Sequence, residues 1–496
     1  MASNFISTYN LLNGPRLQSR AAQVEIARLG KEIVDARHAD VGLVLGAKSG
    51  HSTILYQELK RVETFVTSNG LTSGRLDVTQ SALTEIRTAA ETTLATLVGL
   101  PTNELGAATI KGEAERTLKA LTEKLNSSYA GQRLFSGVKT DTEPMNLNAG
   151  TDKVQKVFAE FQAQYKTLYW DVPPPKPGVP TVNDIVPEAM GIFLNRPDPA
   201  VLVQELRAAA GLNVGDPNTP EIDALSNLAT AVRNGIPATV TPAAAASGTA
   251  TTPPQLVQNF GNVDLSLGGQ FELAVNGAPT TITFTSAADL KAQLEGVPGV
   301  ASAKFGTGND YNVLTIVGTT PGVGETLAVP SATARVAAHL DGAFDDYQWG
   351  AWSSASDTNL TSQISQTESV DSSVNANNAA FRQLAKAYAL LGALPADQMN
   401  EGAFKAAVDH AIKELGKATN GVTILQADLG ATQTRVKTVN EALATQKLLL
   451  QRNLTDLEGV DPAEAKVQLD TVELQLSLSY ALTARLQNLN LLNYVR

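Results

Sequence analysis

The sequence contains no cysteine among its 496 residues. Disulfide bonds, thiolate nucleophiles and cysteine-ligated metal sites are therefore excluded. The absence leaves the cellular compartment open. It suits a cytoplasmic protein, and equally a chain that stays unfolded during export and is afterwards held together by its neighbours.

Aromatic residues are scarce as well, at 5% of the chain, whereas hydrophobic residues as a whole make up 43%. Enough apolar side chains are present for a substantial core. Because the composition is weighted towards alanine, leucine and threonine, it favours helices that meet along narrow seams over an aromatic-rich enzyme core. A chain of this length predicts about two to four domains.

Clustered positive charge is missing, because the 38 basic residues form no run and the 49 acidic residues give a net charge of −11. Phosphate backbones and anionic lipids need grouped cations, so we expect neither nucleic acid nor a membrane among the partners. No apolar run approaches the roughly 18–20 residues of a membrane helix. Residues 1–7 also lack the features of a cleaved signal peptide, so export would need a route without one.

Helical periodicity dominates residues 1–135. A stripe of apolar residues, spaced three or four apart, follows Pro15 and predicts a coiled-coil seam. Gly42, Gly46 and Gly50 interrupt the pattern before it resumes, and the turn signal at 99–101 precedes another helix. We therefore expect a long helix folded back on a second one. The first stripe consists of Ala22, Ile26, Leu29, Ile33 and Ala36.

The C-terminal part mirrors this pattern. Residues 403–453 predict one very long helix, with Gly421 or Gly430 as the points where it would break. After Gly459 and Pro462, a last helix has apolar residues on two faces, so it requires neighbours on two sides. One chain can hardly cover both faces, whereas other copies can. The first face holds Ala465, Leu469, Val472 and Leu476, and the second holds Leu474, Leu478, Leu482, Leu486 and Leu489.

Residues 171–370 differ in composition and predict an insertion carried by the helical ends. A proline-rich linker opens it, helices are expected at 199–210 and 220–233, and residues 236–254 predict an exposed low-complexity loop. A small α/β module is expected at about 258–330. Its marks are alternating strands at 271–275 and 281–284 around an Asn276-Gly277 hairpin, a helix at 287–294, and strands at 300–305 and 311–317.

Catalytic patterns are not found in the sequence. His38, His51, His339 and His410 have no metal-binding spacing, and each is expected to be exposed or to cap a helix. No nucleophile elbow or phosphate-binding loop is present, and Asp345-Asp346 lacks the spacing of a calcium loop. We therefore expect no catalytic, cofactor-binding or metal-binding residues, and no enzyme.

Trp349 and Trp352, with Tyr347, form an aromatic cluster in the sequence. Exposed aromatic rings could bind a sugar or another subunit. The preferred interpretation is an anchor where the sheet of the insertion meets the helical stalk, because large rings dominate packing where they are rare.

Several motifs resemble the bacterial flagellin family. Residues 131–137, GQRLFSG, are similar to its G-x-x-L-F-[AS]-G motif. Residues 489–495, LNLLNYV, are similar to the L-S-L-L-N-Y ending of its hook–filament junction members (hook-associated protein 3). Residues 37–46 and 375–382 resemble the alphaproteobacterial junction type. Residues 35–48 depart from the serine- and asparagine-rich segment of filament flagellins, which favours a junction protein.

The resemblance covers about residues 1–165 and 370–496. It implies a mainly α fold, a long antiparallel helical hairpin or coiled-coil rod built from both chain ends, with an inserted α+β outer domain. The expected organisation is a core of terminal helices at 1–40 and 455–496, a helical rod domain at 41–170 and 371–454, and the outer domain at 171–370.

The implied role is self-assembly at the hook–filament junction of an extracellular flagellum, after export by the flagellar type III system. Implied partners are other copies, hook-associated protein 1, flagellin and an export chaperone, with no cofactor. Alternatives are filament flagellin, or a flagellin-like adhesin that binds glycans. The expected assembly interface comprises Ile26, Leu29, Ile33, Leu469, Val472, Leu476, Leu478, Leu482, Leu486 and Leu489.

Overall fold

The computed structural model describes residues 8–100, 104–171, 184–213, 216–261, 263–306, 312–344, 346–395 and 399–488. Its contacts divide the chain into two compact units. Unit 1 comprises residues 1–71, 364–368 and 435–496, and unit 2 comprises residues 72–363 and 369–434. Each unit therefore combines segments from both halves of the sequence.

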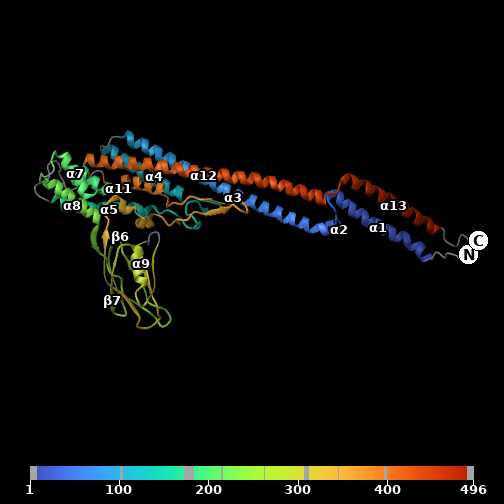
Figure 1. Ribbon diagram of the computed structural model, residues 1–496, viewed down its shortest axis with the longest axis horizontal. Helices are drawn as coiled ribbons and strands as arrows, with labels where there is room; N and C mark the ends of the chain where they lie inside the picture. The colour runs from blue at the N-terminus through green and yellow to red at the C-terminus, as the bar shows by residue number, and fades with distance from the viewer. Residues whose placement is uncertain are drawn as a thin grey trace, which may run out of the picture. The chain divides into compact units, whose positions relative to one another are not determined.

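Unit 1 is built from antiparallel helices (Figure 1). Helix α1 (Thr8–Asp35) packs along α13 (Pro462–Asn488), and the first part of α3 (Ser49–Gly99) packs along the last part of α12 (Glu401–Glu458). The α3–α12 seam is a narrow leucine and valine cluster, as the spacing of apolar residues predicts. Its buried members are Leu55, Val62, Leu443, Leu450 and Leu454.

The interruption predicted around Gly42, Gly46 and Gly50 is present. The short helix α2 (Val41–Leu45) and the 3-10 turn η1 (Gly46–Lys48) separate α1 from α3. Asp40 caps α2, because its Oδ1 accepts a hydrogen bond from the backbone N–H of Leu43 at 2.9 Å. Gly46 has a φ of 52°, which explains why glycine ends α2.

The expected break in the C-terminal helix at Gly421 or Gly430 is wrong, because α12 runs unbroken for 58 residues. Gly421 serves close packing instead. A Cβ atom there would lie 2.8 Å from the Cβ atom of Ala380 in helix α11 (Ala379–Ala393). Tertiary packing of the long helix thus outweighs the low helix propensity of glycine, which costs about 1 kcal/mol per residue. The turn predicted at 99–101 is confirmed by the end of α3 at Gly99.

The helical part of unit 2 surrounds an aromatic core. It contains α4 (Glu104–Leu125), α5 (Leu147–Tyr165), a π-helical turn η2 (Lys166–Trp170), α6 (Pro187–Asn195), α7 (Pro199–Ala209), α8 (Pro220–Asn234), η4 (Leu340–Ala343), α10 (Asp346–Trp352) and α11. Helices α7 and α8 confirm the predictions at 199–210 and 220–233. The rings of Phe158 and Phe193 meet edge to face, with centroids 5.3 Å apart.

A second part of unit 2 is an antiparallel β module. In one sheet the strand order is β3 (Ile236–Thr239), β10 (Thr326–Val336), β6 (Asp264–Val275) and β7 (Ala278–Phe284). The short strand β4 (Ala246–Ser247) pairs with β10 as well. The other has the order β5 (Gln255–Asn259), β9 (Val313–Gly318), β8 (Val300–Phe305). Helix α9 (Ala287–Glu295) completes the module, whose core contains Phe271, Leu273 and Ile316.

The β6–β7 hairpin confirms the strongest turn signal in the sequence. Asn276 and Gly277 have φ angles of 52° and 81°, the left-handed conformation that a two-residue type I′ turn requires. The exposed loop expected at 236–254 is wrong in part, because β3 and β4 lie in this segment and both pair with β10. Strand β10 was not among the predicted strands, although the Pro321-Gly322 pair before it is a local turn signal.

The GQRLFSG motif at 131–137 is a structural element of unit 2. Gly131 turns a hairpin between β1 (Ser128–Tyr129) and β2 (Gln132–Arg133) with a φ of 80°. Phe135 is fully buried and its ring meets the ring of Phe381 edge to face, with centroids 5.8 Å apart. Gly137 has a φ of 63°, and a Cβ atom there would lie 2.3 Å from the carbonyl oxygen of Thr358. The glycines are therefore required by backbone conformation and close approach.

Stability of unit 2 should fall as pH decreases from about 6.5 to about 4, through His339. Burial of the imidazole, helped by the positive charge of Arg196, lowers the pKa of His339 from 6.5 to about 4. The pKa of His339 is lower in the folded state than in the unfolded state, so neutral His339 makes its full contribution to the free energy of unfolding above the unfolded-state pKa. This contribution is lost as pH falls towards the folded-state pKa. The free energy of unfolding should differ by at most about 3 kcal/mol between the two ends of this pH range. Urea unfolding at several pH values measures this difference.

The variant His339→Asn tests this prediction. Asparagine does not titrate, yet its oxygen can replace Nδ1, which accepts a hydrogen bond from the Gly342 N–H at 3.0 Å. We expect a shallower loss of unfolding free energy with decreasing pH. His51→Asn, at an exposed position, should keep the original slope. Equal slopes in His339→Asn and the unchanged protein would refute the assignment.

Candidate assembly interface

The first apolar stripe of α13 faces α1 within unit 1. Leu29 of α1 is buried at 1% exposure and Ala465 of α13 at 2%. Two polar contacts cross the same pair of helices: Ser19 Oγ lies 3.2 Å from Ser479 Oγ, and Gln23 Nε2 donates to the Tyr480 hydroxyl at 2.8 Å. The half-buried members of the expected interface on this side are Ile26, Ile33, Leu469, Val472 and Leu476.

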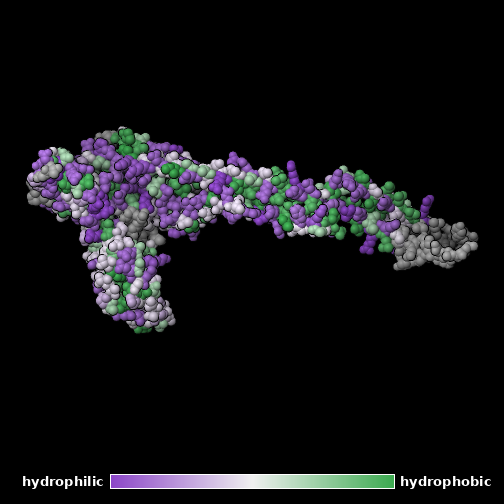
Figure 2. Space-filling model, in the orientation of Figure 1, coloured by the Kyte–Doolittle hydropathy of each residue, from purple (hydrophilic) through white to green (hydrophobic). Residues whose placement is uncertain are grey.

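The second stripe of α13 has no cover within the described chain. Leu474, Leu478 and Leu482 are 61%, 55% and 58% exposed. On α1, Leu17 and Val24 are also more than half exposed. Figure 2 shows hydrophobic residues interspersed with hydrophilic ones along the helices of unit 1. The side chain of Leu486, residue Leu489 and the motif at 489–495 lie outside the described residues.

A groove runs between α1 and α13 beside the second stripe. Its volume is about 620 Å³. Small alanine side chains on α1 leave space, and apolar side chains on α13 border it, so a groove of this kind can receive apolar side chains of a neighbouring helix. The lining residues are Gln18, Ala21, Ala22 and Glu25 on α1, and Val472, Gln475, Leu478, Ser479 and Leu482 on α13.

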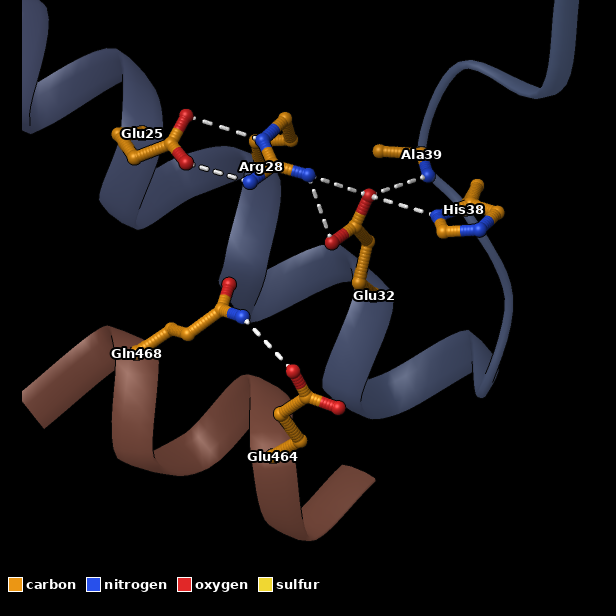
Figure 3. Close-up of polar contacts among 7 residues, drawn as sticks. All are labelled: Glu25, Arg28, Glu32, His38, Ala39, Glu464 and Gln468. Atoms are coloured by element: carbon orange, nitrogen blue, oxygen red, sulfur yellow. Dashed lines mark hydrogen bonds and ion pairs between the residues drawn. The ribbon is translucent and has the colours of Figure 1, made fainter. Parts of the chain in front are cut away.

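A buried carboxylate fixes the end of α1 (Figure 3). Glu32 is 2% exposed, accepts a hydrogen bond from Arg28 Nη1 at 2.8 Å, and accepts one from the backbone N–H of Ala39 at 3.0 Å. His38 Nδ1 lies 3.8 Å from the same Oε1 atom. Arg28 also donates to Glu25, and this hydrogen bond holds the pKa of the Glu25 carboxyl below its usual range. Through Glu32, these contacts tie the helix end to the segment that follows it.

A second buried carboxylate ends α12. Glu458 is 4% exposed, and its Oε2 accepts a hydrogen bond from the Tyr56 hydroxyl at 2.9 Å, while Ser52 Oγ donates to Oε1. Arg37 Nη1 lies 4.0 Å away. Burial, followed by the hydrogen bond to Glu458, raises the pKa of the Tyr56 hydroxyl. A buried carboxylate is stable only when it is paired and hydrogen-bonded, as Glu458 is.

Backbone hydrogen bonds connect the two chain segments between these carboxylates. The N–H of His38 donates to the carbonyl of Glu458 at 2.9 Å, and the N–H of Val460 donates to the carbonyl of Ala36 at 3.1 Å. Ala36 has a φ of 52°, a strained conformation for alanine. We call residues 36–40 and 458–461, with Glu32, the elbow of unit 1. Sequence periodicity does not predict that Glu32 and Glu458 are buried and hydrogen-bonded, because only the fold brings their partners together.

No group of three or more histidine, aspartate or glutamate side chains in the described ranges could hold a metal ion. His339 caps η4 and His51 is exposed, as expected. The expectation is wrong for His38 and His410, which are half-buried and cap no helix, because His38 lies beside Glu32 and His410 lies inside α12. Trp349 and Trp352 are buried at 3% and 0% exposure, so their rings offer no sugar-stacking surface. The side chains of Tyr347 and of the pair at 345–346 lie outside the described residues.

Replacing Glu458 by glutamine should weaken the elbow. The amide keeps the shape but loses the charge-assisted hydrogen bonds, and its NH2 group would face hydroxyl donors, so we expect a loss of about 1–3 kcal/mol. Limited proteolysis should then cut residues 36–48 faster, while unit 2 keeps its protection. Glu464→Gln is the matched control, since Glu464 is exposed and its contact with Gln468, at 3.4 Å, is long. Equal cleavage rates would contradict this account.

The same helical ends match known protein regions. The bacterial flagellin N-terminal helical region matches residues 6–140, and the bacterial flagellin C-terminal helical region matches residues 412–495. No curated protein matches the chain in a sequence search. No helix in the described part of the chain has the length and apolar character needed to cross a bilayer.

Solved structures of flagellar proteins are similar over most of the chain. FlgL of Xanthomonas campestris is 13% identical, covers 81% of this chain and 99% of its own, and gives a TM-score of 0.27. The flagellar junction protein FlgL of Legionella pneumophila is 12% identical, with coverage of 82% and 99% and a TM-score of 0.28. The two terminal matches show that the chain belongs to the bacterial flagellin family, as a structural subunit of the flagellum.

Proposed function

We propose that the chain self-assembles through its terminal helices at the hook–filament junction of the flagellum. The observation that carries the proposal is the two-faced helix α13, whose Leu474, Leu478 and Leu482 are more than half exposed although the opposite face packs on α1. Covering one such leucine is worth about 1.5–3 kcal/mol. A second copy that covers these leucines would therefore gain a large part of its association free energy from this one face.

Packing between copies would be heterologous, because the groove between α1 and α13 and the exposed Leu17 and Val24 of α1 are different surfaces. Heterologous contacts propagate into rings or helical tubes. The neighbours in the axial structure would be hook-associated protein 1 on one side and flagellin on the other. An export chaperone and export through the flagellar type III system complete the proposal, since exposed apolar helices need protection before assembly.

The junction is favoured over the filament by the segment between α1 and α3. In the sequence this segment departs from the serine- and asparagine-rich stretch typical of filament flagellins. In unit 1 it forms the elbow, with Asp40 capping α2 and the N–H of His38 hydrogen-bonded to Glu458. Filament flagellin is the alternative in the same class. We propose no enzymatic activity for either.

A second candidate function is recognition by the insertion at 171–370, in which the protein would act as a flagellin-like adhesin. The observation that favours it is the self-contained β module, which has its own core around Phe271 and Leu273. Such a module could be exchanged or lost without disturbing the terminal helices. Deleting the module and measuring both assembly and surface adhesion separates a binding role from a structural one.

The substitutions Leu478→Asp and Leu482→Asp should abolish assembly while the monomer stays folded. Both side chains are exposed in the isolated chain, so aspartate there costs the monomer little, whereas in an assembled seam it would bury an unpaired charge. Circular dichroism should be unchanged, and sedimentation should show monomers under conditions in which the unchanged protein assembles. In cells, motility should be lost.

Val323→Asp is the matched control, because Val323 is 86% exposed and lies in the β module of unit 2. It introduces the same charge at an exposed apolar position outside the terminal helices. Assembly and motility should both be retained. Normal motility in Leu482→Asp would rule out the second stripe of α13 as an assembly surface.

Position in the flagellum is tested by labelling. An epitope placed at exposed Val323 in the β module should give antibody–gold at one place per flagellum, between hook and filament. A junction ring needs few copies, whereas a filament subunit would be labelled along its whole length. Labelling along the filament would replace the junction assignment by filament flagellin and leave the assembly mechanism standing.

A further inference from the structure

Helix α1 has a second stripe of apolar residues, on the side that faces away from α13. Its members recur at spacings of three and four residues, the repeat of a coiled-coil seam, and all of them are exposed. Leu17, Val24 and Val34 are 68%, 66% and 82% exposed. At about 100° per residue, the stripe lies about 160° around the helix from the one that contains the buried Leu29. We call it the α1 outer seam, and its members are Leu17, Arg20, Val24, Ala27, Lys31 and Val34.

The exposed leucines of α13 belong to a matching repeat. Its members are spaced four or three residues apart, all of them are exposed, and they lie on the side of α13 opposite to the buried Ala465. Neither this repeat nor the α1 outer seam is covered within the described ranges of the chain. We call the repeat the α13 outer seam, and its members are Val467, Thr471, Leu474, Leu478, Ala481 and Arg485.

Charge makes the two outer seams complementary. The α1 outer seam contains two cations, Arg20 and Lys31, which are exposed and have no ion-pair partner in the described part of the chain. Helix α13 is acidic beside its own outer seam, because residues 462–474 carry three carboxylates and one ammonium group. One carboxylate and the ammonium group pair with each other at 2.6 Å. The other two carboxylates, Glu464 and Glu473, are exposed and can attract a cation from another copy.

Heptad spacing predicts how the two outer seams align. An antiparallel pair that sets Leu17 of one helix opposite Leu478 of the other also sets Val24 opposite Thr471, seven residues further along each helix. Apolar or small side chains therefore meet at both levels. Within one copy α1 and α13 are antiparallel as well (Figure 1), so the outer pair repeats the geometry of the inner one.

The same alignment brings opposite charges together. One heptad further on, Lys31 lies opposite Glu464. Arg20 lies two residues, or about 3 Å along the axis, from the position opposite Glu473, an offset that two long side chains can span. Apolar contacts alone allow helices to slide past one another, whereas charge pairs beside a seam select its orientation and register.

We propose that the α1 outer seam of one copy docks antiparallel on the α13 outer seam of the next copy, in this register. The inference rests on the proposed self-assembly, and it adds the occupant, the direction and the register of the contact. Each terminal helix then lies between two antiparallel neighbours, one from its own chain and one from another copy. Because the two outer seams are different surfaces, the contact is heterologous and continues from copy to copy. A contact between two α13 outer seams would instead close into a dimer.

Disulfide mapping tests the pairing directly, because the chain has no native cysteine. The double variant Val24→Cys/Thr471→Cys, assembled and then oxidised, should give a ladder of covalent oligomers on a non-reducing gel. Its two cysteines lie on the outward sides of different helices, too far apart to link within one copy. Val24→Cys/Ala481→Cys is the matched control and should give no ladder, because these positions lie in the two seams but ten residues, or about 15 Å, out of register.

Three results would overturn the pairing. If the assembled double variant gives no ladder, another surface covers the α13 outer seam. If Thr471→Cys alone gives disulfide dimers, two α13 outer seams face each other, and an equal ladder from the control would refute the register. Each of these results leaves self-assembly standing, whereas failure of the unchanged protein to assemble would remove the proposed function together with this contact.

Charge reversal tests the ion pairs. Arg20→Glu and Glu473→Arg should each weaken association about threefold to tenfold, since each brings like charges together beside the seam. An equal mixture of the two variants should assemble like the unchanged protein, because alternating copies then meet opposite charges on both sides. Lys48→Glu, at an exposed position in η1 outside both seams, is the control and should assemble normally. No recovery on mixing, or normal assembly of Arg20→Glu alone, would overturn the proposed register.

Discussion

Helix α13 has more apolar surface than its own chain covers, and this constraint governs the rest of unit 1. Its first stripe packs on α1, where Leu29 is almost fully buried. The second stripe, from Leu474 to Leu482, remains exposed. Hydrophobic burial is proportional to the apolar area removed from water and has no direction of its own. The free energy gained by covering this stripe therefore favours association, but it leaves the geometry of association to other groups.

The elbow supplies directional interactions that an apolar seam lacks. Glu32 and Glu458 are buried carboxylates, and each receives donors from residues beyond its own helix, such as the N–H of Ala39 and the hydroxyl of Tyr56. Removing one partner of a buried charge is costly, whereas an apolar contact can slide along a helix at little cost. Such pairs can therefore specify a joint without adding much net stability. The elbow accordingly sets the path of the chain from α1 to α3 and from α12 to α13.

Local signals in the sequence predicted a good part of the fold, and non-local ones were missed for definable reasons. The Asn276-Gly277 turn and the end of α3 at Gly99 depend on backbone preferences that adjacent residues encode. Gly421 was misjudged because its role is contact with Ala380, and β10 was missed because its partners β3, β4 and β6 all lie far before it in the sequence. The apolar stripes of the interface were visible from spacing alone. The elbow glutamates were not, since a single glutamate near a helix end has no distinctive pattern.

The two units reach stability by different routes, and this explains the composition that first set the chain apart. All three tryptophans lie in unit 2, where the rings of Trp349 and Trp352 stack with centroids 5.8 Å apart. Unit 1 relies on thin seams, such as that of Leu55 and Leu450. A unit with an aromatic core can be stable as a single copy. A unit of paired helices with exposed leucines gains its remaining stability by mass action, as copies associate. The three tryptophans therefore lie where the chain must fold alone, and leucine stripes are placed where it must not remain alone.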